Sequence, residues 1–215
     1  MKVFLKRYGY DLSKTTVHKY MNKILNLTSV IMRKKPKYKV GHPHKIFENL
    51  LKRDFTVSKK NKVWCTDFTY MRYPNGKFRY NCTLIDLYDR TVVSSMNGSY
   101  INSRLAIDTL QKALVKENQP KGLILHSYQG GQYSSWEFTM FCNKHGIRQS
   151  KAGCPYDNAP MERYYNTFKN SFYYINRFES IKAMDDATDR YVNYYNYVRS
   201  HSYNDYLTPM EARMK

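Results

Sequence analysis

Alternating apolar and polar residues dominate the chain from residue 63 onward, and this alternation predicts strands. The segment VWCTDFTYM (63–71) alternates and is rich in residues that favour strands. The residues YPNGK that follow are a strong hairpin-turn signal, after which FRYNCTLIDLYD (78–89) predicts a second strand. TVVSSMNGSY (91–100) predicts a third. The central part of the chain therefore begins as strands linked by hairpins.

Helical spacing of apolar residues appears after residue 102 and then alternates with short apolar runs. The pattern predicts helices at 103–117, 134–145, 158–173 and 180–199, short strands at 122–127 and 147–150, and a last short element at 207–214. Hairpin-linked strands followed by alternating helices and strands give a mixed α/β plan. A ribonuclease-H-like sheet with helices on both faces fits this order, which by itself also permits other α+β folds.

One short amphipathic helix is predicted at 13–26, where Ser13 or Thr15 provides the N-terminal cap. It follows a glycine-containing turn and looks like the second half of a helix-turn-helix whose first half is truncated or absent. Such a helix lies in a DNA major groove. The alternative is a helix that only packs on the core.

The segment after this helix is basic and is interrupted by prolines and a glycine, which break regular structure. We therefore divide the chain into a partial helix-turn-helix at 1–32, a basic linker at 33–62 and a catalytic-type core at 63–215. The boundary of the core could lie as early as about residue 55.

The net charge of +19 is concentrated in the first third of the chain. Residues 1–62 hold 17 Lys and Arg against 3 Asp and Glu, or +14, whereas residues 63–215 hold 19 against 14, or +5. A polyanion is the natural partner of such a segment, and a solvated, disordered basic arm is the alternative. We predict DNA contacts from the basic residues of the helix and linker, namely Lys14, Lys19, Lys23, Arg33, Lys34, Lys35, Lys37 and Lys39.

Other classes of protein are disfavoured by composition. No apolar stretch approaches the roughly 20 residues of a membrane helix, and the start lacks the pattern of a signal peptide, so a cytoplasmic location without membrane contact is expected. The four cysteines show no CxxC spacing, which argues against a zinc site and favours reduced, mostly buried thiols.

Two carboxylates stand in positions that suggest chemistry. Asp67 lies inside an otherwise apolar strand, where a carboxylate is costly unless it is paired or bound to a metal. Glu162 lies about one turn into a helix, where the helix dipole alone could also favour it. Asp157 and Asn158 are interpreted as helix caps rather than ligands. Asp86, in the second predicted strand, could support a neighbouring metal ligand or partly substitute for a lost carboxylate.

Three segments, WCTDFT, HSYQGGQY and YDNAPME, occur in this order over the core. They resemble the integrase-core transposases of bacterial insertion sequences, within the DDE superfamily that includes the retroviral integrases. The family pattern is roughly W-x-T-D-[IF]-T, H-S-D-Q-G-x-Q-Y and Y-D-N-A-x-x-E, and the ending RSHSYNDYLTPMEA is similar to the family's RPHxxLxxxTP-like endings. The resemblance covers about residues 55–215, together with the partial helix-turn-helix.

This resemblance implies cleavage and transfer of DNA strands by a two-metal mechanism, in which three carboxylates hold two Mg²⁺ (or Mn²⁺) ions. By carry-over, Asp67 is the first metal ligand and Glu162 the third, while His126 and Ser127 shape the loop between them. The implied partners are transposon terminal inverted repeats and target DNA. A homo-oligomer and a nucleoid-associated location in a bacterial cytoplasm are implied as well.

Tyr128 stands where the family has its second carboxylate. A phenol is neutral at physiological pH and bulkier than an aspartate, so it does not replace that ligand. The step from 128 to 162 is 34 positions. The family pattern has about two more residues between these positions. A loop shortened in RQSKAGCP would shift the helix that carries Glu162 by a distance large enough to disturb catalytic geometry.

These departures predict a degenerate or truncated transposase that is inactive because Tyr128 replaces the second acidic ligand. The alternative is a non-catalytic, DNA-binding remnant of a transposase. A ribonuclease-H-type nuclease also suits the fold, but the YDNAPME and LTPMEA signatures favour the transposases.

Overall fold

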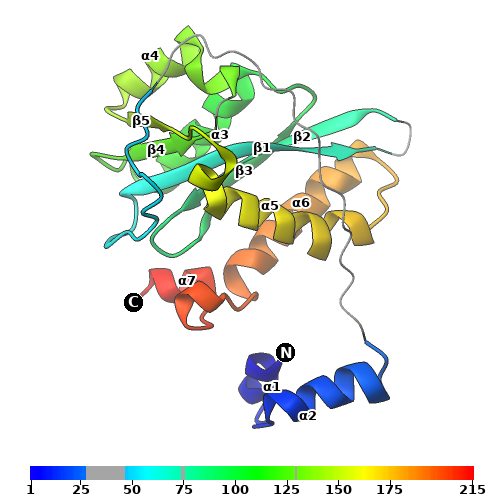
Figure 1. Ribbon diagram of the computed structural model, residues 1–215. Coiled ribbons are helices and arrows are strands. Elements are labelled where there is room, and N and C mark those ends of the chain that lie inside the picture. The colour runs from blue at the N-terminus through cyan, green and yellow to red at the C-terminus, as the bar shows by residue number, and fades with distance from the viewer. Residues whose placement is uncertain (28–46, 74–75, 129) are drawn as a thin grey trace.

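A five-stranded mixed sheet forms the centre of the fold (Figure 1). The computed structural model describes residues 1–27, 47–73, 76–128 and 130–215. The strands are β1 (Val63–Arg72), β2 (Phe78–Asp86), β3 (Val92–Gly98), β4 (Ile124–Ser127) and β5 (Arg148–Lys151). Their order is β3-β2-β1-β4-β5. β1, β2 and β3 pair antiparallel, and β4 and β5 run parallel to β1, so β1 joins the hairpin half of the sheet to its parallel half.

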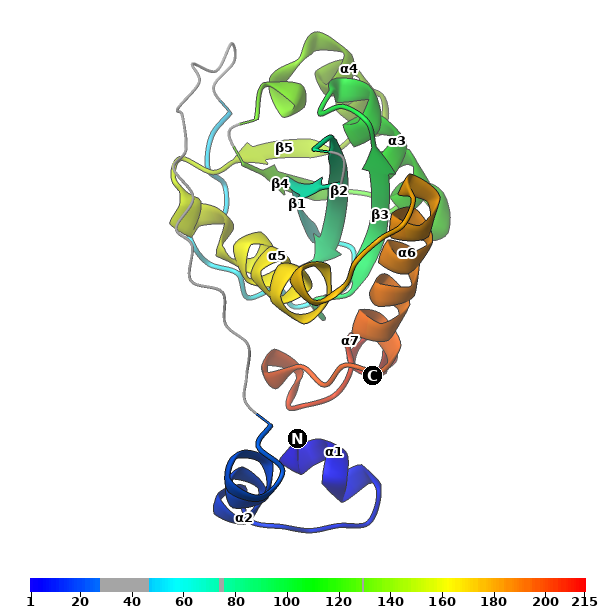
Figure 2. The ribbon, with the colours of Figure 1, turned by 90° about the vertical axis from the view of Figure 1, so that its right-hand side faces the viewer.

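Helices cover both faces of this sheet (Figure 2). The main helices are α3 (Ser103–Lys116), α4 (Trp136–Lys144), α5 (Ala159–Ser171), α6 (Ile181–Tyr197) and α7 (Pro209–Arg213). α3 and α4 pack on one face and α5 and α6 on the other. The predicted mixed α/β sheet with helices on both faces is confirmed.

Side-chain caps set the starts of these helices. Asn102, Ser135 and Ser180 each accept a hydrogen bond from a backbone N–H in the first turn of α3, α4 and α6. Thr208 and Glu211 form a reciprocal capping box at α7, with Pro209 in the first turn. The predicted elements agree with the observed ones to within a few residues at each end.

Aromatic side chains fill the core between the sheet and the pair α5 and α6. Tyr164 meets Tyr195 edge to face at 5.1 Å, and Phe168 meets Tyr191 at 5.2 Å, between ring centroids. Such pairs stabilise by about 0.5–1.5 kcal/mol beyond the area they bury. This aromatic packing fixes α5 and α6 against the sheet.

Two short helices precede the core. α1 (Lys2–Arg7) was not predicted, and α2 (Lys14–Lys19) continues into a π-helical turn, Tyr20–Ile24, where the pattern predicted one longer helix. Ser13 caps α2 through the N–H of Thr16 at 3.0 Å, as predicted. Arg7 connects this region to α7 through the carboxylate of Glu211 at 2.9 Å. Most of the predicted linker, residues 28–46, lies outside the described residues.

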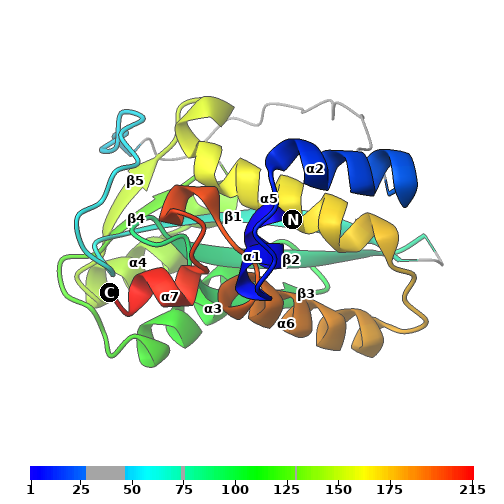
Figure 3. The same ribbon diagram turned by 90° about the horizontal axis from the view of Figure 1, so that it is seen from below.

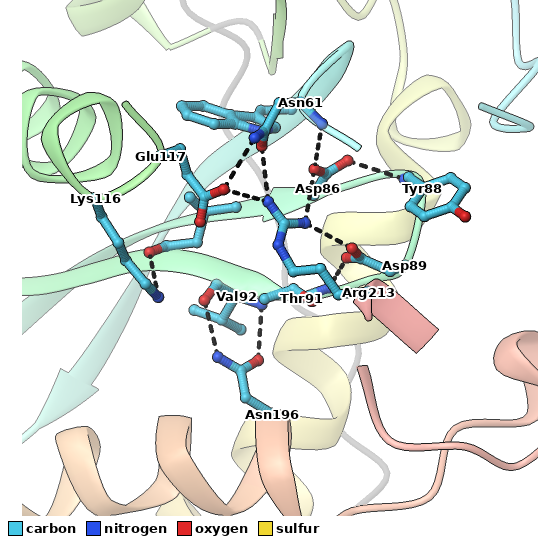
Figure 4. A network of polar contacts seen from close by, with 12 residues as sticks. Asn61, Asp86, Tyr88, Asp89, Thr91, Val92, Lys116, Glu117, Asn196 and Arg213 are labelled. Atoms are coloured by element: carbon cyan, nitrogen blue, oxygen red, sulfur yellow. Dashed lines mark hydrogen bonds and ion pairs between the residues drawn. The ribbon is translucent and has the colours of Figure 1, made fainter. Parts of the chain in front are cut away.

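Arg213 of α7 lies at the centre of a buried polar network (Figure 4). Its Nη1 donates to Asp86 at 3.0 Å and to Asp89 at 2.6 Å, and its Nη2 donates to Asn61 at 2.8 Å and to Glu117 at 2.5 Å. These partners come from the end of β2, the turn after it, the segment before β1 and the end of α3. One guanidinium therefore connects α7 to three separate parts of the core.

The charges in this network depend on one another. Burial disfavours the charge on Arg213, but the carboxylates around it outweigh this and raise its pKa. Burial raises the pKa of Asp86, and repulsion from Asp89 adds to that shift. Hydrogen bonds from the backbone N–H groups of Asn61 and Tyr88 partly counter it. Removing the guanidinium would leave buried negative charge without compensation.

We predict that Arg213→Met lowers the free energy of unfolding by about 3–5 kcal/mol, because a buried ion pair that loses one partner leaves the other uncompensated. Urea denaturation at neutral pH measures the change. Arg190→Met, at an exposed position of α6, is the matched control and should shift stability by less than about 0.5 kcal/mol. Equal stabilities for the two variants would contradict the role given to Arg213.

Candidate functional site

The parallel pairing of β1 and β4 brings Asp67 and Tyr128 next to each other. Thr66 pairs with Ser127 at the end of the β1–β4 ladder, and Asp67 and Tyr128 are the next residues of the two chains. Parallel strands end at the same edge of a sheet, where open α/β sheets place their ligands. Both side chains are half-buried. The edge of the sheet at β1 and β4 is therefore the candidate site.

α5 carries the third predicted residue, Glu162, to this edge. Tyr165, one turn further along α5, donates from its hydroxyl to the carbonyl of Asp67 at 2.7 Å. Asn158, just before α5, reaches the carbonyl of Thr66 through its side-chain amide at 3.4 Å. These contacts hold the start of α5 against β1 on either side of the exposed Glu162.

A buried hydrogen-bond chain fixes the loop that leads into α5. His126 Nε2 lies 2.8 Å from the carbonyl of Asp157, and Nδ1 lies 2.8 Å from the hydroxyl of Ser150. A carbonyl only accepts, so Nε2 carries the proton and Nδ1 accepts from Ser150, whose oxygen in turn accepts from the N–H of Leu50 at 3.0 Å. Burial lowers the pKa of His126, consistent with this neutral form. We call these residues the His126 chain; it links β4, β5 and the loop before α5.

Asp157 caps the same loop, and Arg53 pairs with it. Its carboxylate accepts from the N–H groups of Gly153 and Cys154 at 2.9 and 3.1 Å, and from Arg53 Nε at 2.8 Å. The bond from Arg53 is the main reason that the pKa of Asp157 falls to about 2. The interpretation of Asp157 as a cap is confirmed for the loop. Asn158 occupies the N-cap position of α5, but its side chain accepts no hydrogen bond from the backbone of that helix.

Sequence reasoning missed Arg53 and Tyr165. Arg53 falls in the segment assigned to the linker, although neighbouring Leu51 is buried in the core and Phe55 packs against it. Tyr165 carries no signal beyond its place on the buried face of a helix. The hydrophobic residue at position 51, within a basic segment, was the sequence signal that could have moved the start of the core to an earlier residue.

The charges of the site show that its three residues are close together. Burial raises the pKa of Asp67 to about 7, and the negative charge of Glu162 adds to the shift, against a hydrogen bond from the N–H of Phe68. Burial also raises the pKa of Glu162. Tyr128 has a raised pKa because of burial and the charges of Asp67 and Glu162. The predicted residues Asp67, Tyr128 and Glu162 therefore gather in one place.

The donor set does not fit two divalent metal ions. Mg²⁺ takes hard, charged oxygen ligands, and the site offers two carboxylates and a phenol whose raised pKa keeps it protonated. Within 1–27, 47–73, 76–128 and 130–215, no group of three or more His, Cys, Asp and Glu side chains is placed to hold a metal.

Asp86 does not replace the missing carboxylate, which corrects that reading of the sequence. It pairs with Trp64 across the β1–β2 ladder, whereas Asp67 pairs with Thr83. Three residues along a strand span about 10 Å. The Asp86 carboxylate is bound instead by Arg213 at 3.0 Å.

The predicted DNA-contacting residues are only partly described. Lys14, Lys19 and Lys23 are exposed along α2 and the turn after it. Lys19 and Lys23 lie four residues apart, which places them on one side of the helix. The others, Arg33, Lys34, Lys35, Lys37 and Lys39, lie outside the described residues.

Two further expectations concern cysteines and membranes. The cysteines are free thiols: Cys65, Cys82 and Cys142 are buried and Cys154 is half-buried, as predicted. None of the helices in the described part of the chain has the length and apolar character needed to cross a membrane.

Comparison with known families gives matches over most of the core. Residues 57–157 match an integrase core domain model, and residues 144–209 match a second model of the same description. These two stretches include the whole candidate site.

Curated relatives are similar along much of the chain. Transposase InsF for insertion sequence IS3A of Escherichia coli strain K12 is 33% identical over 178 residues, which cover 81% of this chain and 62% of that protein. The putative transposase InsK for insertion sequence element IS150 of the same strain is 32% identical over 212 residues, covering 97% of this chain and 74% of that protein. The chain thus spans less than two thirds of the InsF transposases.

Solved structures share the fold. The catalytic core domain of HTLV-2 integrase in complex with magnesium matches with a TM-score of 0.59 at 20% identity, covering 72% of this chain and 97% of that one. A simian T-cell lymphotropic virus intasome in complex with a PP2A regulatory subunit matches with a TM-score of 0.61 at 17% identity, covering 100% of this chain and 70% of that one. The ribonuclease-H-like plan of the sheet and its helices is therefore confirmed.

The raised pKa of Asp67 predicts that this residue destabilises the fold above acidic pH. A carboxyl whose folded-state pKa is raised to about 7 stabilises the fold at low pH, and that contribution is lost as pH rises through 7. Asp67→Asn keeps an acceptor for the N–H of Phe68 and removes the charge. We expect it to raise the free energy of unfolding by about 2 kcal/mol at pH 8, after allowance for solvent screening, and by much less at pH 4.5.

Urea denaturation at the two pH values measures this difference. Asp189→Asn, which changes an exposed carboxyl on α6, is the control and should show no such pH dependence. A stability gain from Asp67→Asn that is equal at both pH values, or absent at pH 8, would refute the buried-charge explanation.

Proposed function

Because this chain belongs to the insertion-sequence transposases that carry an integrase core domain, we propose that it binds DNA as they do but does not cut and join DNA ends. The observation that carries this proposal is the position of Tyr128. It stands beside Asp67 and Glu162, where a two-metal site needs a third carboxylate. The chain has the fold of the family but lacks the negative charge of a third carboxylate at the candidate site.

We assign Asp67 and Glu162 as the remaining metal ligands. In a complete site, two divalent ions would activate the attacking oxygen and stabilise the leaving oxygen of a phosphodiester. Here the two carboxylates stand beside a protonated phenol, and each has a raised pKa mainly because burial disfavours its charged form. Without cations between them, the same carboxylates repel the phosphate groups of DNA. The site therefore lacks what phosphoryl transfer requires.

The Tyr128 hydroxyl is also a poor nucleophile. Burial and the charges of Asp67 and Glu162 raise its pKa, so the phenolate is strongly disfavoured at neutral pH. This argues against a covalent route in which the tyrosine itself attacks DNA. The function left to the chain is binding.

The basic first third supports DNA as the partner. Residues 1–62 carry a net charge of +14, and Lys14, Lys19 and Lys23 are exposed on α2 and the turn after it. We propose that residues 1–32 act as the partial helix-turn-helix and that 63–215 form the core. We propose that the linker 33–62 contacts phosphates through its basic first half, because its second half packs on the core. Terminal inverted repeats and target DNA are the proposed ligands, bound by a homo-oligomer in the bacterial nucleoid. Similar integrase cores occur in trimeric and dimeric forms.

We predict no strand transfer by the native chain with Mg²⁺ or Mn²⁺, because the second acidic ligand is absent. The assay uses labelled duplexes that carry the inverted repeats flanking the coding sequence. Tyr128→Asp should raise joining above background by on the order of 10²-fold, either alone or with two residues inserted after Lys151. Tyr128→Phe, which removes the hydroxyl without adding charge, is the matched control and should remain inactive.

Two outcomes of that assay would overturn the proposal of inactivity. One is joining by the native chain that is lost in Asp67→Ala. The other is equal recovery by Tyr128→Phe and Tyr128→Asp, since then charge at this position would not decide activity.

We also predict DNA binding that depends steeply on salt and on the lysines of the N-terminal helices. Lys14→Gln, Lys19→Gln and Lys23→Gln together should reduce the slope of log K against log salt by up to about 3, since each phosphate contact adds about 0.9. Fluorescence anisotropy across a salt titration gives the slope. The control removes the same charge from exposed core lysines, Lys112, Lys121 and Lys144. Identical slopes for the two triple variants would place the DNA contacts elsewhere.

A further inference from the structure

Four basic side chains gather where the end of α6 faces the first turn of α5. Arg163 lies in α5, Arg199 and His201 follow α6, and Arg90 lies in the turn between β2 and β3. The positive charges of all three arginines lower the pKa of His201, so each lies within electrostatic range of its ring. We call these four residues the arginine cluster. Figures 1 and 2 show the segment between α6 and α7 below α5, and Figure 3, seen from below, shows this segment and α1 on the near side of the core.

Aromatic rings hold two of these guanidinium groups in place. The guanidinium carbon of Arg90 lies 3.9 Å from the ring centroid of Tyr203, and that of Arg199 lies 5.7 Å from the ring of Tyr195. Tyr195 also contacts the ring of His201 edge to face at 6.1 Å. Stacking of this kind orients a guanidinium without neutralising it. These contacts order Arg90 and Arg199 and leave their positive charges in place.

The positive charge of the cluster is unmatched. All 17 Asp and Glu residues lie in the described part of the chain, and none of them forms an ion pair with Arg90, Arg163 or Arg199 there. Asp89, next to Arg90 in the chain, is bound to Arg213 at 2.6 Å. Like charges brought together without a counter-ion destabilise a fold unless an anion binds between them.

Buried polar atoms without hydrogen-bond partners also suggest that an anion binds at the arginine cluster. Arg90 is only 8% exposed; its Nη2 donates to the carbonyl of Phe55, whereas its Nη1 is buried with no hydrogen-bond partner among the described residues. The hydroxyl of Ser200, between Arg199 and His201, is likewise buried and unpartnered. Buried polar atoms without partners are rare in folded proteins, and a bound water or anion near Arg90 would supply the acceptor that its Nη1 lacks.

His201 completes the set as a neutral donor. Its Nδ1 accepts from the N–H of Tyr203 at 3.3 Å, so the proton of the neutral ring is on Nε2. Burial, together with the charges of Arg199, Arg90 and Arg163, lowers the pKa of His201 to about 4. At neutral pH the ring therefore offers an N–H without adding to the repulsion.

We propose that Arg90, Arg163, Arg199 and His201 bind a phosphate group, which in the working protein is a backbone phosphate of DNA. Guanidinium groups match the oxygens of a phosphate with paired hydrogen bonds. The choice of DNA rests on the proposed function and on location. Arg163 directly follows Glu162, and Arg7 of the basic N-terminal region bonds to Tyr206 and Glu211 beside the cluster. A strand that leaves the N-terminal helices for the candidate site would pass this cluster.

The first experiment tests the phosphate site without DNA. Inorganic phosphate is titrated into the full chain at constant ionic strength and pH 7, and the ring signals of His201 are followed by NMR. We expect a saturable shift with a dissociation constant of roughly 1–10 mM, and a His201 pKa raised by the bound anion. Arg199→Gln should weaken the constant by at least roughly threefold. Arg177→Gln, which removes the same charge from an exposed position past the far end of α5, should leave it unchanged.

The second experiment tests whether the phosphate belongs to DNA. Arg163→Gln and Arg199→Gln should each weaken duplex binding by roughly three- to tenfold at 0.1 M salt and reduce the salt slope by about 1, without altering any base preference. Arg177→Gln should bind as the native chain does. Circular dichroism melting of each variant checks that the fold is retained.

The two experiments separate failure of this inference from failure of DNA binding itself. If His201 shows no saturable response to phosphate, or the same response in Arg199→Gln, the site does not exist. If phosphate binds but Arg163→Gln and Arg199→Gln bind DNA as Arg177→Gln does, the assignment to DNA is wrong. If the chain binds no DNA at all, the phosphate titration still decides the site, and only the proposed function falls.

Discussion

Three buried carboxylates, Asp86, Asp89 and Glu117, lie together only because the guanidinium of Arg213 stands among them. Moving four charged groups out of water is costly, and only dense mutual bonding offsets that cost. As a result, α7 is bonded into the core of the fold. Its position in turn fixes the segment after α6, and so the placement of the arginine cluster relative to α5.

The candidate site shows the opposite electrostatic balance. Asp67 and Glu162 share an edge of the sheet with no cation among their described neighbours, and both have a raised pKa. What holds them together is the surrounding framework: Tyr165 bonds α5 to β1, and the His126 chain bonds the loop before α5 to β4 and β5. The framework tolerates Tyr128 because a neutral phenol adds no further charge to this edge. The residues that position the candidate site are thus different from the residues that carry its charge.

Much of the fold followed from sequence because strands and helices have periods that the apolar residues reveal. The proximity of Asp67, Tyr128 and Glu162 followed from three ordered motifs and not from periodicity. Arg213 was missed because its partners lie 96 to 152 positions away, and a long-range ion pair leaves no periodic trace. α1 was missed because it buries no residue, so its six residues show no apolar stripe.

The parallel register of β1 and β4 has an evolutionary consequence. Main-chain pairing at Thr66 and Ser127 holds the backbone of residue 128 beside Asp67, whatever side chain it bears. Tyrosine and aspartate codons differ only in their first base. A single point mutation therefore switches position 128 between an uncharged and a charged side chain without altering the main-chain pairing that holds it beside Asp67.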